Sequence, residues 1–128
     1  MDRRGLLSAA ANPDKQLDYL VTLTGHMTSG GAGRHAVEVR YVPDKFVLEA
    51  RSLGAYLDAL ASMTWENPEE LAVTILTDLN NELVARWAQV RVNVPERHHH
   101  AVETHGVVIE DRQPGWDNPG LLGRLERL

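Results

Sequence analysis

Three segments of the chain alternate apolar and polar residues, which is the pattern of β-strands that bury one face. In one of them Val37, Val39 and Tyr41 share one side, while Glu38 and Arg40 share the other. The expected strands are residues 17–24, 35–42, a short return strand over 46–50, 88–94, and a last strand within 101–110.

Two segments between these strands have the apolar spacing of amphipathic helices. The first is expected to begin at Ser52, whose hydroxyl can accept a hydrogen bond from an N–H of the first turn. The second has the stronger start, because Asn67 is a cap candidate, Pro68 takes the first helical position and Glu70 the third, as in a capping box. Its apolar stripe consists of Leu71, Ile75, Leu79 and Leu83.

The order of elements is strand, strand, helix, helix, strand, strand. This order predicts an α+β fold in which two helices cover one face of an antiparallel four-stranded sheet. The polar strand face, with residues such as Arg40, Gln89 and Arg91, must then meet solvent or the lumen of a barrel built by several subunits. We expect a flexible N-terminal arm over 1–11, the folded domain over 12–110 and a C-terminal tail over 111–128.

Composition narrows the classes of protein that fit. The chain has 128 residues, which suits one domain, and its net charge of −5 argues against a nucleic-acid partner. No run approaches the roughly 18 apolar residues of a membrane span. The absence of cysteine excludes disulfides and a cysteine nucleophile, and it suits a cytoplasmic location.

Four segments, in their order and spacing, resemble the QueF-type nitrile reductases. They read DYLVTL, RYVPDKFVLEARSLGAYL, TDL and RWAQVRVNVPER, and the likeness spans roughly residues 12–110. The resemblance implies the tunnelling fold, a ββααββ unit whose copies join into an oligomeric barrel with sites between neighbours. The exposed edges of a four-stranded sheet, closed by strand pairing around a ring, likewise predict a homo-oligomer larger than a dimer. Members of the family reduce 7-cyano-7-deazaguanine with NADPH.

The chain departs from the family pattern at the chemistry. The resemblance implies a nucleophilic cysteine and an aspartate in the loop after the first strand, where this chain reads GHMTSGGAGRHA. It implies a His-Glu pair at the start of the second helix, where Pro68 and Glu69 stand. For the cofactor phosphates it implies two lysines, replaced here by Arg51 and Gly54, and an arginine, which Arg97 matches with a displacement of one residue. We therefore do not expect NADPH to be the cofactor.

Glu69 is the leading candidate for substrate binding. A carboxylate can accept two parallel N–H groups from the edge of a guanine-like or pterin-like ring. The alternative is that Glu69 only complements the positive end of the helix dipole. Glu49, Arg51, Ser52 and Arg97 are the other substrate-binding candidates. Glu49 could face the site or solvent, and Arg51 could hold a phosphate or neutralise Glu49.

Histidines supply the remaining candidates. His26 and His35 flank the shortened loop, and either imidazole could transfer protons near pH 7. In a strand, His99, Glu103 and His105 would share one face, with His98 and His100 on the other, and three such ligands plus water would suit a catalytic divalent metal. The alternative is that these histidines are ordinary surface residues.

These observations favour an enzyme of heterocycle metabolism that holds a purine-, 7-deazapurine- or pterin-like ring through Glu69. Its chemistry would be non-covalent acid–base catalysis, and its partners would be a small heterocycle and copies of itself. Two alternatives stay open: a metal-dependent hydrolase or cyclohydrolase that uses the C-terminal histidines, and a ligand-binding or partner subunit without catalysis.

Overall fold

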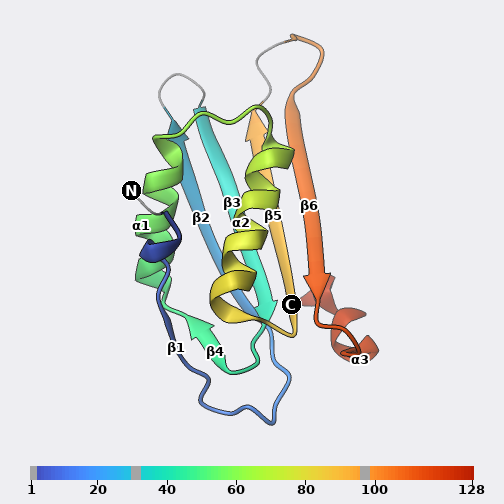
Figure 1. The fold of residues 1–128 in the computed structure, drawn as a ribbon. Helices are drawn as coiled ribbons and strands as arrows, with labels where there is room; N and C mark the ends of the chain where they lie inside the picture. Colours follow the sequence, from blue (N-terminus) through green and yellow to red (C-terminus); the bar gives the residue numbers. More distant parts are fainter. Residues whose placement is uncertain (1–2, 30–32, 96–98) are drawn as a thin grey trace.

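The computed structural model describes residues 3–29, 33–95 and 99–128. An antiparallel sheet carries two helices on one face, as the strand and helix order predicts (Figure 1). In chain order the elements are η1 (Arg3–Leu6), β1 (Ala9–Ala11), β2 (Val21–Ser29), β3 (Gly33–Val42), β4 (Phe46–Leu48), α1 (Ala50–Ala61), α2 (Pro68–Leu83), β5 (Trp87–Pro95), β6 (Thr104–Arg112), α3 (Pro119–Leu122) and η2 (Leu125–Arg127).

The main sheet has the strand order β2-β3-β5-β6, and every neighbouring pair is antiparallel. This is the arrangement expected of a ββααββ unit. The predicted return strand exists as β4, but it pairs with β1 in a separate two-stranded sheet rather than joining the main one. Two sheets therefore form where the order of strands and helices predicts one.

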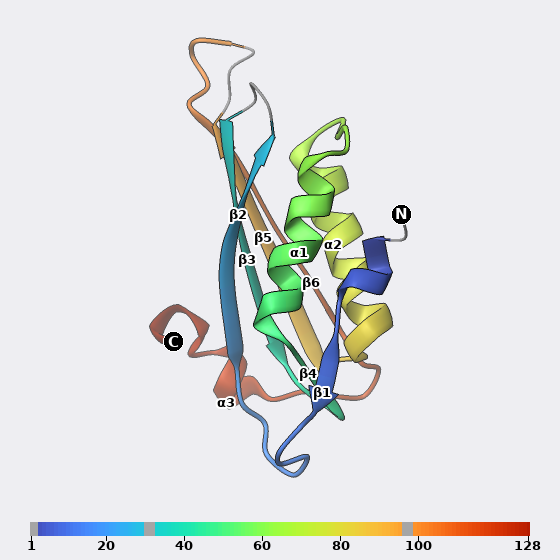
Figure 2. The same cartoon turned by 90° about the vertical axis from the view of Figure 1, so that its left-hand side faces the viewer.

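The core lies between the helices and the inner face of the main sheet (Figure 2). Val39 and Val90 face each other across β3 and β5, and both have 0% of their surface exposed. The predicted stripe of α2 is buried against them, with Leu71, Ile75, Leu79 and Leu83 each at most 1% exposed. Removing this apolar surface from water is the main force that holds the helices on the sheet.

The start of α1 differs from the prediction. The helix begins at Ala50, two residues before Ser52, and Glu49 holds the cap position with an extended backbone and no side-chain cap bond. The Ser52 hydroxyl donates to the backbone oxygen of Glu49 and accepts from the backbone N–H of Ser8. Ser52 therefore ties the N-terminal segment to α1, a contact that no local sequence pattern can indicate.

Residues 3–11 also differ from the expected flexible arm, because they pack against the domain. Leu7 is 4% exposed and belongs to the core, and β1 pairs with β4 along its whole length. Arg3 reaches α2, where its Nε atom donates to Asp78 Oδ2 at 2.8 Å. The buried Tyr56 of α1 donates to the same oxygen at 2.5 Å. A single buried carboxylate thus connects the N-terminus, α1 and α2.

The C-terminal tail crosses to the opposite face of the sheet, where α3 lies on the side away from α1 and α2 (Figure 2). Leu121 packs there on Val42 and Trp87, which form a second apolar cluster. Asp18 accepts hydrogen bonds from Arg86, Trp116 and Asn118, so it fastens the tail to the start of β2 and to the turn before β5.

No helix in the described part of the chain is both long and apolar enough to cross a membrane. The polar face of the sheet is only partly exposed to solvent, because the C-terminal tail covers one end of it. Arg40 and Gln89, which were expected to meet solvent or a lumen, are 9% and 8% exposed.

Replacing Tyr56 by Phe keeps the ring and removes the donor to the buried carboxylate of Asp78. We expect the free energy of unfolding to fall by about 1.5–3 kcal/mol, the typical contribution of a hydrogen bond to a carboxylate, because Asp78 Oδ2 then keeps only the bond from Arg3. Urea unfolding at pH 7 measures it. Tyr19→Phe is the matched control, because its acceptor, Asn12 Oδ1, is a neutral amide oxygen, and a hydrogen bond between neutral groups contributes only about 0.5–1.5 kcal/mol. Equal losses in both variants would contradict this role of Tyr56.

The same network predicts a pH dependence. Burial, together with the hydrogen bond to Asp78, raises the pKa of the Tyr56 hydroxyl. The unfolded chain can ionise Tyr56 near the ordinary value of about 10, whereas the folded chain cannot. The stabilisation is therefore complete below about pH 10 and is lost as the pH rises further. This alkaline loss should be smaller in Tyr56→Phe.

Candidate functional site

Glu69 lies in the first turn of α2, where two neighbouring residues already cap the helix. The Asn67 side chain accepts from the backbone N–H of Glu70 at 2.8 Å. The Glu70 carboxylate reaches back to the backbone N–H of Glu66 at 3.1 Å. This confirms the predicted cap and leaves the carboxylate of Glu69 unused by the helix start.

Glu69 instead contacts β6. Its Oε1 atom lies 2.8 Å from Nε2 of His105, with the two side chains 55% and 36% exposed. Within the part of the chain that the structure describes, this is the one polar contact of Glu69, so Oε2 is open to a ligand. The pair joins the positive end of α2 to the edge strand of the sheet, a position that favours negative charge.

His35 lies on the same face of the sheet as His105. Val94 pairs with His105 across β5 and β6, while Ala36 and Asn93 pair on the opposite face. The Nδ1 atom of His35 is buried and has no hydrogen-bond partner among the described residues. A buried polar atom without a partner lacks a hydrogen bond that a small ligand or water could supply.

His26 and His35, which were expected to flank a loop, lie on opposite faces of the sheet. Both lie within strands, because β2 runs to Ser29 and β3 begins at Gly33. Met27 pairs with His35 and Ala36 pairs with His26, so alternation places the two imidazoles on opposite faces. His26 accepts at Nδ1 from Arg34 Nη2 at 2.8 Å.

Glu49, Arg51 and Ser52 lie at the start of α1, away from Glu69. The two helices run antiparallel, so the start of α1 and the start of α2 are at opposite ends of the helical layer (Figure 1). One copy of the chain therefore does not bring these candidates together with Glu69. Arg97 lies outside the described residues.

The residues at the positions implied for cofactor phosphates do not fit a dinucleotide phosphate well. Arg51 is exposed on α1 and supplies one cation. Gly54 supplies none, and a Cβ atom there would meet no other atom within 4 Å, so packing does not prevent a side chain at this position. The described residues thus offer one cation where the resemblance implies two.

The expected metal ligands do not come together either. Among the described residues, no group of three or more His, Asp or Glu side chains could hold a metal ion. His105 is held by Glu69, and His99 stacks on His100 with ring centroids 4.6 Å apart. His99, Glu103 and His105 therefore do not form the predicted set, and His98 lies outside the described residues.

Comparisons with known proteins point to one group of enzymes. The NADPH-dependent 7-cyano-7-deazaguanine reductase of Syntrophus aciditrophicus is 28% identical over 139 aligned residues, covering 93% of this chain and 94% of that protein. The protein of the same name from Acidithiobacillus ferrooxidans is 29% identical over 133 residues, covering 93% and 86%. No family model matches the chain. This weak similarity supports a distant relationship with the nitrile reductases.

Stability measurements alone can test whether Asn67 caps α2 while Glu69 contributes little to the fold. Asn67→Ala removes the cap, and we expect the free energy of unfolding to fall by about 1 kcal/mol. Glu69→Gln alters only a half-exposed contact with His105, so its loss should stay below that, as is typical of surface pairs. Thermal or urea unfolding measures both. A larger loss for Glu69→Gln than for Asn67→Ala would show that Glu69 is a structural residue.

Proposed function

We propose that the chain binds a planar nitrogen heterocycle of the 7-deazapurine, purine or pterin kind, with Glu69 as the anchor, in a pathway related to that of the nitrile reductases. One observation carries the proposal: Glu69 is a carboxylate at a helix start that the helix does not need. Asn67 and Glu70 satisfy the cap, and Oε2 of Glu69 is open.

The geometry suits recognition of a ring edge. A guanine-like edge presents a ring N–H beside an amino group, and a carboxylate accepts both in parallel. In this structure Nε2 of His105 lies at hydrogen-bond distance from Oε1, which holds the carboxylate in place before a ligand arrives. A ligand amino group would share or take over that oxygen.

His105, rather than His26 or His35, is the better candidate for acid–base chemistry. It contacts the anchoring carboxylate, so it would lie beside a bound ring and could give or accept a proton there. His35 lies on the same face with a buried Nδ1 atom that lacks a partner, and it is the second candidate. His26 lies on the other face of the sheet, so it is no longer a candidate for acid–base chemistry at this site.

The curated relatives are named for a reduction that, by the resemblance, needs a cysteine. This chain has none. Thr28 and Ser29 stand in the corresponding segment, and a hydroxyl is a far weaker nucleophile than a thiolate unless a base activates it. We therefore propose ring binding without the covalent reduction and without NADPH as cofactor.

Self-association would complete the site. The edge strands β2 and β6 have no neighbour on their outer sides within the described sheet, and such edges favour pairing with another copy. Because α1 packs on β2 and α2 packs on β5 and β6, such pairing would bring α1 of one copy, which carries Glu49, Arg51 and Ser52 at its start, beside α2 of the next. A homo-oligomer with sites between subunits is the assembly that we propose.

Glu69→Gln should weaken binding of 7-cyano-7-deazaguanine, or of the best guanine-like or pterin-like compound in a thermal-shift screen, by about 1.5–3 kcal/mol, which is roughly 10- to 150-fold in affinity. Isothermal titration calorimetry measures the loss. Glu82→Gln, on the same helix at its other end, is the control and should bind as the unchanged protein does. Unchanged affinity in Glu69→Gln, with the same mass by light scattering, would rule out the anchor.

The second prediction concerns the reaction. Protein mixed with 7-cyano-7-deazaguanine and NADPH should show no steady oxidation of the cofactor, measured by its absorbance, and no mass increase of the intact chain. The physical reason is the missing thiolate, which leaves the nitrile carbon without a nucleophile. Cofactor oxidation coupled to amine formation would contradict the proposal and show that other residues perform the reduction.

A further inference from the structure

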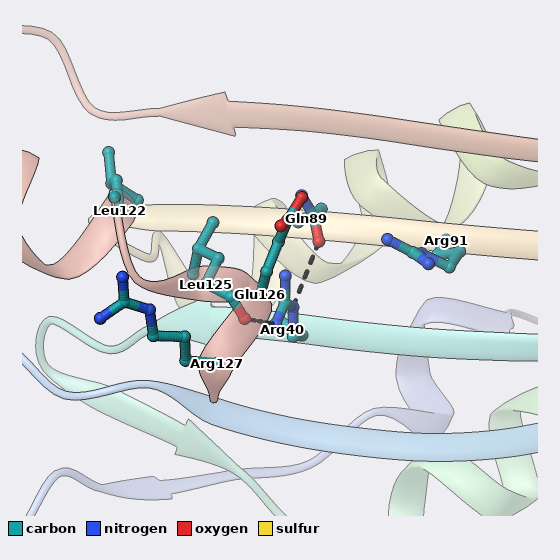
Figure 3. Close-up of a pocket in the computed structure, with 8 residues that line it drawn as sticks. Arg40, Gln89, Arg91, Leu122, Leu125, Glu126 and Arg127 are labelled. Carbon is teal, nitrogen blue, oxygen red and sulfur yellow. Dashed lines mark hydrogen bonds between the residues drawn. The ribbon is translucent and has the colours of Figure 1, made fainter.

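A hollow lies on the outer face of the sheet, on the side away from α1, α2 and Glu69. Its volume is about 420 Å³, and it lies between β3, β5 and the C-terminal tail, open to solvent on one side (Figure 3). The lining residues are Arg40, Gln89, Arg91, Leu122, Gly123, Leu125, Glu126 and Arg127. Pockets that hold small organic ligands have volumes of roughly 300–1,000 Å³.

Arg40 forms the floor of the hollow and is held rigidly. Its Nε atom donates to Gln89 Oε1 at 3.2 Å, and Nη1 donates to the backbone oxygen of Leu125 at 3.0 Å. Its side chain is 10% exposed. A guanidinium carries five N–H donors, so the described contacts leave several of them unused. Burying a cation is costly unless it is paired, and here the pairing is incomplete.

Arg91 lies on the neighbouring strand and shares a loose partner with Arg40. The Oε1 atom of Glu38 is 3.7 Å from Nε of Arg40 and 4.0 Å from Nε of Arg91. Both distances are too long for a hydrogen bond. One carboxylate oxygen therefore lies between two guanidinium groups without satisfying either of them.

The other lining side chains form a charged part and an apolar part of the hollow. Arg127 and Glu126 border the hollow from the tail, while Leu122 and Leu125 give it an apolar side. The lining carries three arginines and one glutamate, and Glu38 beside it adds a second carboxylate, so the arginines outnumber the acids here although the chain's net charge is −5. A purely structural role explains Arg40, which supports the tail, but it does not explain Arg91, which is 53% exposed and makes no described contact with the tail.

We propose that this hollow binds a small organic oxyanion, with the anionic group between Arg40 and Arg91 and the organic part against Leu122 and Leu125. The chemistry is that of a phosphate ester or a dicarboxylate, because guanidinium groups bind both in a bidentate manner. A dianion is favoured over a single charge, since it must outcompete Glu38. The site is independent of Glu69, which lies on the other side of the sheet.

Thermal unfolding in increasing phosphate, in succinate, and in chloride at matched ionic strength tests the proposal. We expect a saturable rise in Tm with phosphate or succinate that chloride does not give, because a ligand that binds only the folded state stabilises it. A rise with phosphate alone identifies a phosphate ester, and a rise with succinate alone identifies a dicarboxylate. No saturable rise with either overturns the site.

Two substitutions locate the binding. Arg91→Gln, at an exposed position, should abolish the rise, whereas Arg34→Gln should keep it; Arg34 is an exposed arginine on the same strand as Arg40, about 20 Å away. Glu38→Gln should lower the Kd severalfold by removing the competing carboxylate. Asp58→Asn, an equal charge change on α1, should leave the Kd unchanged. Equal rises in Arg91→Gln and Arg34→Gln would overturn the proposal. Arg40 is left intact because its loss could unfold the tail.

Discussion

The pairing of β3 with β5 is the contact on which the whole structure depends. The two hairpins, β2 with β3 and β5 with β6, are local in sequence, but β3 and β5 are separated by both helices. Their register sets which side chains face inward, since a slip of one residue would move the apolar set to the opposite face. The same register puts Val39 and Val90 under the helices and Arg40 and Gln89 under the tail.

Much of this arrangement was predictable because it is periodic. Alternation identified the strands, and the spacing of Asn67, Pro68 and Glu70 identified the start of α2. The contacts that were missed have no local pattern. The strands that carry His26 and His35 extend into a segment rich in Gly and Ser, since β2 ends at Ser29 and β3 begins at Gly33, and Ser52 bonds to Ser8, a residue 44 positions away. The tail joins the outer face through Trp116, Leu121 and Asp18, whose spacing follows neither a helix nor a strand.

The candidate site shows the same limit. Capping chemistry separates Glu70 from Glu69 in the sequence, but only the fold reveals that His105, 36 residues later, lies against Glu69. The weak similarity supports a distant relationship with the nitrile reductases, while the chain itself has no cysteine. One fold can host different reactions, because function depends on the side chains of the site rather than on the arrangement of helices and strands.

The position of the tail has a consequence for any ring of these subunits. If the outer sheet faces line a central passage, each copy carries its own α3 and η2 into that passage at the same end. The number of tail segments inside the passage rises with the number of copies. The interior would then be narrowed at one end, and small molecules would enter and leave from the other.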